Sequence, residues 1–119
     1  MGLDMYIENN NEEVVFQWRK FPSVHEWFRE LGLKKGIENC EEMSFNGVEV
    51  PINIKDIKKF KKDLLNKNMN YDVEGFFFGS DSDMTKEEFS YYMEENMKSI
   101  KIMKQELRNG KKIYYTSWW

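Results

Sequence analysis

The residues best suited to covalent chemistry are the single histidine, His25, and the single cysteine, Cys40. A cysteine attacks as its thiolate, which a neighbouring imidazole can generate by accepting the thiol proton. Against such a pair, His25 falls in the first turn of a predicted helix, whose dipole lowers imidazole basicity, and unpaired cysteines are usually buried. Two such residues are also too few for a zinc site. We therefore predict no catalytic residues, no metal and no cofactor, with a small enzyme using His25, Cys40 and an acid such as Asp4 as the alternative.

Aromatic residues make up 16% of the chain and fall mostly on or near predicted strands. Most of them must form the core, but neighbouring side chains on a strand point to opposite faces, so some must line a cleft or face solvent. Flat rings beside a guanidinium suit stacking on bases and pairing with phosphates. We predict a pocket for a nucleotide-like ligand, formed by Trp18, Arg19, His25, Phe77 and Tyr114.

The last two residues, Trp118 and Trp119, suggest a second use of aromatic surface. They cannot share one face of a strand, and tryptophan is enriched at the energetic centres of protein interfaces. We predict both as interface anchors with which the protein could mask a partner protein, and we do not rank this mechanism against ligand capture. Exposed aromatic edges also leave a homo-oligomer open.

A basic segment, Lys55 to Lys67, carries six lysines against two aspartates. Such a segment is usually a solvated helix face, and the net charge of −3 argues weakly against nonspecific duplex binding. Nucleic acid is therefore a weaker alternative partner, bound through the 55–67 lysine face.

The elements that position these residues begin with two paired strands, over residues 3–7 and 14–19. Pro22 and Ser23 open a helix, with Ser23 and Glu26 as a capping box. Val24, Trp27, Phe28 and Leu31 recur at helical spacing and define its buried face.

The second half of the chain predicts a hairpin, two helices and two extended segments. Asn46-Gly47 between two short apolar runs predicts a small hairpin. Asn53 caps a helix that buries Ile54, Ile57, Phe60 and Leu64. Residues 75–80 are extended, Thr85 and Glu88 cap a long helix that ends at Asn109-Gly110, and residues 113–119 form a last strand.

This element order has no regular alternation of strands and helices, so it predicts an α+β fold: a small, mostly antiparallel sheet packed against about three helices. With 119 residues, the chain fits a single domain, residues 1–119. No apolar run is long enough to span a membrane and no signal peptide opens the chain. A lone cysteine favours a reducing compartment, so we expect a cytoplasmic protein.

Six segments spread over nearly the whole chain carry a family resemblance. They are Met1-Gly2-Leu3-Asp4-Met5-Tyr6, Trp18-Arg19-Lys20, His25-Glu26-Trp27-Phe28, Gly36-Ile37-Glu38-Asn39-Cys40, Gly75-Phe76-Phe77-Phe78-Gly79-Ser80 and Ile113-Tyr114-Tyr115-Thr116-Ser117-Trp118. In order and spacing, these segments resemble a family of small phage and prophage proteins that open with the same residues and close in a Tyr-Tyr-x-Ser-Trp-like strand. The departures are a longer 41–52 segment and a second terminal tryptophan, Trp119.

The resemblance implies a phage setting rather than a particular chemistry. Members are sometimes called phosphoglycerate kinase, but this chain is too short for a two-domain kinase and has no glycine motif that cradles phosphate. Small accessory phage proteins often antagonise host defences. The resemblance therefore implies a stoichiometric antagonist of bacterial defence in the cytoplasm of the host cell, which binds a host defence protein or a small nucleotide-like ligand, without a membrane partner.

Overall fold

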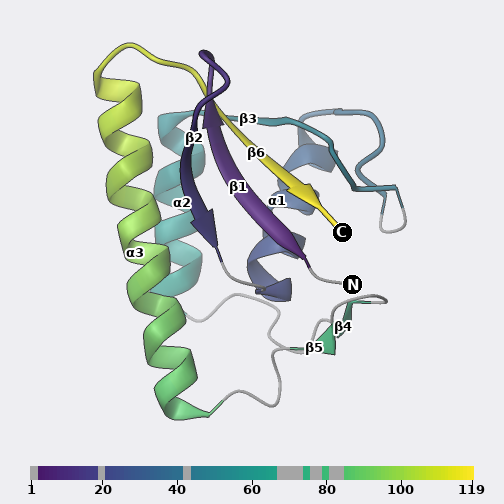
Figure 1. Cartoon of the computed structure of the whole chain (residues 1–119), viewed down its shortest axis with the longest axis vertical. Coiled ribbons are helices and arrows are strands. Elements are labelled where there is room, and N and C mark those ends of the chain that lie inside the picture. The colour runs from purple at the N-terminus through teal and green to yellow at the C-terminus, as the bar shows by residue number, and fades with distance from the viewer. Residues whose placement is uncertain (1–2, 19–20, 42–43, 67–73, 76–78, 81–84) are drawn as a thin grey trace.

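A four-stranded antiparallel sheet forms one layer of the molecule, with the strand order β2-β1-β6-β3. Its strands are β1 (Asp4–Asn9), β2 (Val14–Trp18), β3 (Val50–Ile52) and β6 (Ile113–Trp118). In the computed structural model, the described residues are 3–18, 21–41, 44–66, 74–75, 79–80 and 85–119 (Figure 1). Two further short strands, β4 (Glu74–Gly75) and β5 (Gly79–Ser80), pair with each other within the segment predicted to be extended.

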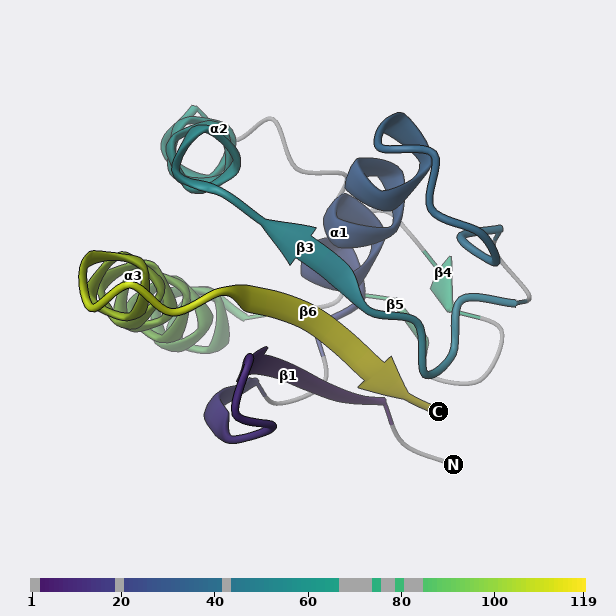
Figure 2. The same ribbon diagram turned by 90° about the horizontal axis from the view of Figure 1, so that it is seen from above.

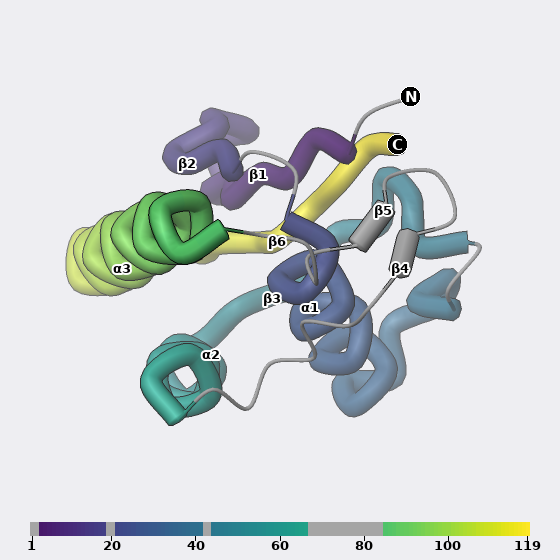
Figure 3. Tube along the Cα trace, turned by 90° about the horizontal axis from the view of Figure 1, so that it is seen from below, coloured from purple at the N-terminus to yellow at the C-terminus, as the bar shows by residue number. Residues whose placement is uncertain are grey.

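Three helices in the described part of the chain form the second layer. They are α1 (Pro22–Lys34), α2 (Ile54–Leu65) and α3 (Lys86–Arg108). Figures 2 and 3, which view the molecule from above and below, show all of them on one side of the sheet. The predicted α+β class, with an antiparallel sheet and three helices, is thus confirmed. None of the helices in the described ranges is both long enough and apolar enough to cross a bilayer.

The register of the sheet decides which side chains face the helices. Met5 lies opposite Ser117 and Ile7 opposite Tyr115, and all four side chains are buried. These residues define the inner face. The alternate positions define the outer face, which no described helix covers. Its members on β1 and β6 are Asp4, Tyr6, Glu8, Tyr114, Thr116 and Trp118.

Aromatic rings join the inner face to the helices. The ring of Phe28 on α1 stacks on Tyr115 with centroids 4.2 Å apart, and it also contacts Trp18 on β2 and Phe60 on α2. The four residues are almost completely buried. Burial of rings this large dominates the energy of a core, so this cluster holds both layers together.

Two of the three helices begin at the predicted N-cap residue, and of the capping box predicted from Thr85 and Glu88 the structure shows the Thr85 bond. Asn53 and Asp56 form a reciprocal capping box at the start of α2, and the Thr85 hydroxyl accepts a hydrogen bond from the amide of Glu88 at the start of α3. The start of α1 differs from the prediction. Its N-cap is Phe21, which makes no side-chain cap bond.

The capping box predicted from Ser23 and Glu26 does not form because both residues have other surroundings. Ser23 is buried inside the first turn, and the Glu26 carboxylate instead accepts hydrogen bonds from the guanidinium of Arg29. The predicted burial of Ile54 is also wrong, since this first residue of α2 is exposed. The other three residues of the predicted α2 stripe are buried, as expected.

The hairpin predicted around Asn46-Gly47 is not formed. Gly47 does adopt the left-handed conformation, with φ +72°, but its amide donates to the carbonyl of Ser117, and β3 pairs with β6. The segment therefore docks along the edge of the last strand. A partner distant in sequence has replaced the local one that the turn signal suggested.

Candidate functional site

The described residues of the predicted nucleotide pocket do not come together. Trp18 is 2% exposed and His25 is 4% exposed, so both belong to the core. Tyr114 points from the outer face of the sheet, on the opposite side from these two residues. Arg19 and Phe77 lie outside the described residues. The predicted set therefore forms no common pocket among its described members.

The polar atoms of the two core residues are engaged in hydrogen bonds. The indole nitrogen of Trp18 donates to the Asn96 side-chain oxygen over 2.7 Å. The Nδ1 atom of His25 lies 2.7 Å from the hydroxyl of Tyr115. These bonds stabilise buried polar groups, which are costly when left unpaired.

Neither His25 nor Cys40 has the protonation behaviour of a nucleophilic pair. Burial, together with the charge of Arg29, lowers the pKa of His25 to about 3, so its imidazole is a weak base. Burial raises the pKa of the Cys40 thiol, whose sulfur packs against Gly32. Asp4, the acid of the enzyme alternative, lies on the outer face. The described geometry favours a structural role for His25 and Cys40.

A cavity formed by described residues lies where α3 turns into β6. Its volume is about 630 Å³, and we call it the α3–β6 pocket. Its lining comprises Pro51, Ile52, Asn53, Ile54, Lys104, Leu107, Arg108, Lys111, Lys112, Ile113 and Tyr114. Six of these residues are apolar or aromatic, and four carry cationic side chains.

Local structure explains why these residues meet. Lys104 and Arg108 are four residues apart on α3, which places them on one side of the helix. The helix ends at Asn109, and Gly110 takes a left-handed conformation with φ +79°. The chain then turns and enters β6, where Ile113 pairs with Ile52 and Tyr114 with Pro51. The pocket therefore lies between the last turn of α3, the β3–β6 pair and the start of α2.

The charge of the α3–β6 pocket is largely uncompensated. Lys111 lies 3.8 Å from the carboxylate of Glu13. Lys104, Arg108 and Lys112 form no ion pair with a carboxylate in the described ranges. Arg108 and Lys112 are also exposed. A site with this charge favours an anion, and an arginine can bind a phosphate through two parallel hydrogen bonds.

A second, smaller hollow of about 200 Å³ opens beside Tyr114 on the outer face. Three carboxylates line it, from Glu8, Glu12 and Glu49. Burial first, and then the charges of Glu49 and Glu12, raise the pKa of Glu8. Within the described ranges, no histidines, cysteines or carboxylates gather in a geometry that would hold a metal ion.

The two predicted interface anchors differ in their surroundings. Trp118 is 59% exposed, and its ring lies over Gly47. Trp119 is half-buried, and its indole nitrogen donates to the carbonyl of Phe45 over 2.7 Å. The side chain of Asn46 additionally bonds both the amide and the carbonyl of Trp119. Trp118 is therefore available to a partner, whereas hydrogen bonds hold Trp119 against Phe45 and Asn46.

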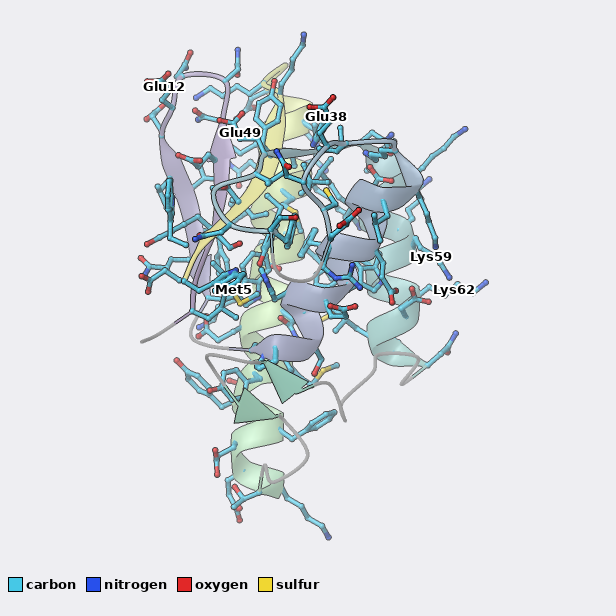
Figure 4. All side chains as sticks on the ribbon, turned by 90° about the vertical axis from the view of Figure 1, so that its right-hand side faces the viewer. Met5, Glu12, Glu38, Glu49, Lys59 and Lys62 are labelled. Carbon is cyan, nitrogen blue, oxygen red and sulfur yellow. The ribbon has the colours of Figure 1, made fainter. Side chains whose placement is uncertain are left out.

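The lysines of α2 form a solvated helix face, as the sequence pattern predicts. Lys59 and Lys62 point away from the molecule on the side of α2 (Figure 4). Lys59 pairs with Asp63 over 3.0 Å, and Asp63 also accepts a hydrogen bond from the indole nitrogen of Trp27. Lys67 lies outside the described residues.

Sequence reasoning found Tyr114 but missed the cations of the α3–β6 pocket. Lys104, Arg108, Lys111 and Lys112 are spaced four, three and one residues apart across a helix end. The spacing of Lys104 and Arg108 is a signal that could have identified those two, because residues four apart lie on one side of a helix. Lys111 and Lys112 follow the end of the helix. No family model, curated protein or solved structure matches the chain. The function is therefore inferred from the residues and their geometry.

Proposed function

We propose that this protein is a phage or prophage accessory protein that antagonises a bacterial defence by binding a nucleotide-like signalling ligand in the α3–β6 pocket. The observation that carries the proposal is the presence of apolar residues and largely uncompensated cations in the lining of one cavity. A nucleotide combines a flat apolar base with anionic phosphates, and it needs both kinds of surface. The phage setting comes from the family resemblance.

The composition of the pocket favours capture over conversion of the ligand. Its described lining includes no histidine, cysteine or carboxylate, the residues that most often act as general bases. The lysines of the lining can pair with phosphates, and its apolar residues can contact a base. A protein that works in this way removes its ligand stoichiometrically, so its effect depends on its abundance in the host cytoplasm.

Calorimetric titration with AMP, ATP and a cyclic dinucleotide tests the proposal. At least one nucleotide should bind, and Arg108→Ala should weaken binding about tenfold, since hydrogen bonds to charged groups contribute about 1.5–3 kcal/mol. Lys101→Ala is the matched control because Lys101 is exposed on α3 and does not line the pocket. Failure of every nucleotide to bind, or equal weakening by both variants, would contradict ligand capture.

Masking of a host defence protein is a second candidate function. The observation that favours it is Trp118, a residue that is 59% exposed and whose ring lies against Gly47. An exposed ring that is already positioned loses little conformational freedom when a partner covers it. Trp118→Ala should abolish the anti-defence effect in cells if this mechanism operates, whereas Arg108→Ala should leave the effect intact.

A further inference from the structure

The outer face of the sheet has the features of an interaction surface, which adjoins the α3–β6 pocket at Tyr114. No described helix covers it, and Figure 2 shows every helix on the other side of the sheet. An antiparallel sheet tolerates a solvated face when its outward side chains are polar. Here several of these side chains are aromatic. They are Tyr6, Tyr114 and Trp118.

The aromatic residues of the outer face are arranged around Thr116. Tyr6 lies directly opposite Thr116 in the β1–β6 register. Tyr114 and Trp118 flank Thr116 on the same strand and point to the same side. Thr116 is only 4% exposed although no described helix lies over it. The outward residues Tyr114, Thr116 and Trp118 follow one another along β6, and we call them the apolar strip.

The charge of the outer face is negative near the strip. Asp4 and Glu8 project from β1 on this face, and Glu8 shares the 200 Å³ hollow beside Tyr114 with Glu12 and Glu49. No lysine or arginine lines that hollow among the described residues, although the exposed Lys112 is near it in sequence and its amide donates to the side chain of Asn10. Figure 4 shows Glu12 and Glu49 at one end of the molecule and the lysines of α2 on another side. Those lysines therefore do not neutralise the hollow.

The charge distribution indicates what could cover this face. A second copy placed by two-fold symmetry would set the same carboxylates against each other, since such interfaces use one patch on both subunits. Like charges in contact across an interface are unfavourable. A cationic partner has the opposite charge, and its ammonium or guanidinium group would also be attracted to the face of a tyrosine ring.

We propose that the outer face docks an extended cationic segment of a partner protein, with a lysine or arginine in the hollow against Tyr114 and an apolar side chain on Trp118. This inference rests on the second candidate function and adds the chemistry of the partner to it. Side chains of an extended segment alternate between its two sides. Residues on one side of such a segment therefore meet the apolar strip and the hollow in turn.

A fluorescently labelled peptide that alternates arginine and valine is the probe, and its glutamate–valine counterpart is the control peptide. Fluorescence anisotropy should show binding of the arginine peptide alone, with an affinity that falls as salt is added. Amide NMR shifts on titration should map to β1 and β6, with the largest changes around Tyr6, Glu8 and Thr116. Shifts that map to the helices, or equal binding of both peptides, would overturn the inference.

Matched variants separate the charge of this face from the overall charge. The pair Glu8→Gln and Glu49→Gln should weaken binding of the arginine peptide about fivefold, as expected when charge pairs across an interface are lost. The pair Glu87→Gln and Glu94→Gln removes the same charge from exposed positions on α3 and should leave binding within about twofold of the unmodified protein. Equal weakening by both pairs would overturn the inference.

Two further outcomes distinguish the ways in which the inference can fail. Self-association in sedimentation experiments that disappears in the Glu8→Gln, Glu49→Gln variant would assign the face to a second copy and overturn the cationic partner. If the arginine peptide does not bind but Trp118→Ala abolishes the anti-defence effect, masking stands and the partner chemistry is wrong. If neither effect is seen, both proposals fall.

Discussion

At the scale of single residues, this core pairs its large rings with polar partners. The indole nitrogens of Trp18 and Trp27 donate to Asn96 and Asp63, and the hydroxyl of Tyr115 lies 2.7 Å from His25 Nδ1. A buried ring with a polar atom needs such a partner. His25 stands out in the sequence as the single histidine. In the structure it is the hydrogen-bond partner of the Tyr115 hydroxyl inside the core.

The burial of His25 leads to a pH-dependent stability. Its pKa is about 3 in the folded protein and about 6.5 in an unfolded chain. Between these values the unfolded chain binds the proton and the folded protein does not, so the free energy of unfolding falls as pH decreases from 6.5 towards 3. The slope contributed by His25 should approach about 1.4 kcal/mol per pH unit.

Urea denaturation between pH 7 and pH 4.5 measures this slope before most carboxylates titrate. A His25→Gln variant has no imidazole, so it should show a flatter pH dependence over the same range. Its stability at pH 7 should also be lower, because the bond to the Tyr115 hydroxyl is altered in a buried site. If the variant kept the pH dependence of the unmodified protein, the proton bound on unfolding would not be bound by His25.

Gly47 gives a second prediction at the residue scale. Its φ is +72°, and a β-carbon placed there would lie 3.0 Å from the ring of Trp118. Gly36 has a similar φ of +71°, but a β-carbon placed there would meet no other atom within 4 Å. A substitution at Gly36 therefore measures the cost of the backbone conformation without a steric contact. We expect Gly36→Ala to cost about 1 kcal/mol of stability, and Gly47→Ala to cost more and to shift the indole N–H resonance of Trp118. Equal costs with an unmoved resonance would contradict the contact.

At the scale of elements, local signals predicted structure well wherever the interacting groups are close in sequence. The cap at Asn53, the cap at Thr85 and the end of α3 at Asn109 are all observed, since each depends on groups within one turn. The Asn46-Gly47 hairpin failed because β6, far along the chain, supplies the pairing partner instead. The Ser23–Glu26 box failed because Arg29 holds Glu26.

The cap of α2 can be tested directly. The Asn53 side chain accepts a hydrogen bond from the Asp56 amide over 2.9 Å, and the Asp56 carboxylate accepts one from the Asn53 amide. Asn53→Ala should lower the free energy of unfolding by about 1 kcal/mol. Asn53→Ser should keep most of the stability of the unmodified protein, because serine also caps helices. Chemical denaturation measures both changes. A serine variant as unstable as the alanine variant would show that the cap is not the source of the loss.

The candidate site was less predictable than the elements because it depends on which face of the sheet the helices cover. Strand alternation correctly separates Tyr114 from Tyr115, but it does not tell which of them faces the helices. Trp18 is consequently in the core and Tyr114 at the surface, although the sequence grouped them. The cations of the α3–β6 pocket meet β3 only through the β3–β6 pairing, a contact that no local signal indicates.

At the scale of the whole molecule, one cluster of rings connects the sheet to the helix layer. Phe28 contacts Trp18, Trp27, Phe60 and Tyr115, with ring centroids between 4.2 and 5.7 Å apart. These partners come from β2, α1, α2 and β6. Loss of this ring should therefore weaken both layers together rather than one element alone.

Phe28→Ala should cost about 3–5 kcal/mol, a large fraction of the 5–15 kcal/mol that stabilises a typical domain. Phe28→Leu is the matched control, since it keeps an apolar side chain in the cavity and should retain much of the stability. Thermal unfolding followed by near-ultraviolet circular dichroism reports the rings, and the far-ultraviolet signal reports the helices. Because both layers share this ring, the two signals should shift together to a lower temperature in Phe28→Ala. Loss of the near-ultraviolet transition alone would mean that the helix layer is stable without the aromatic cluster.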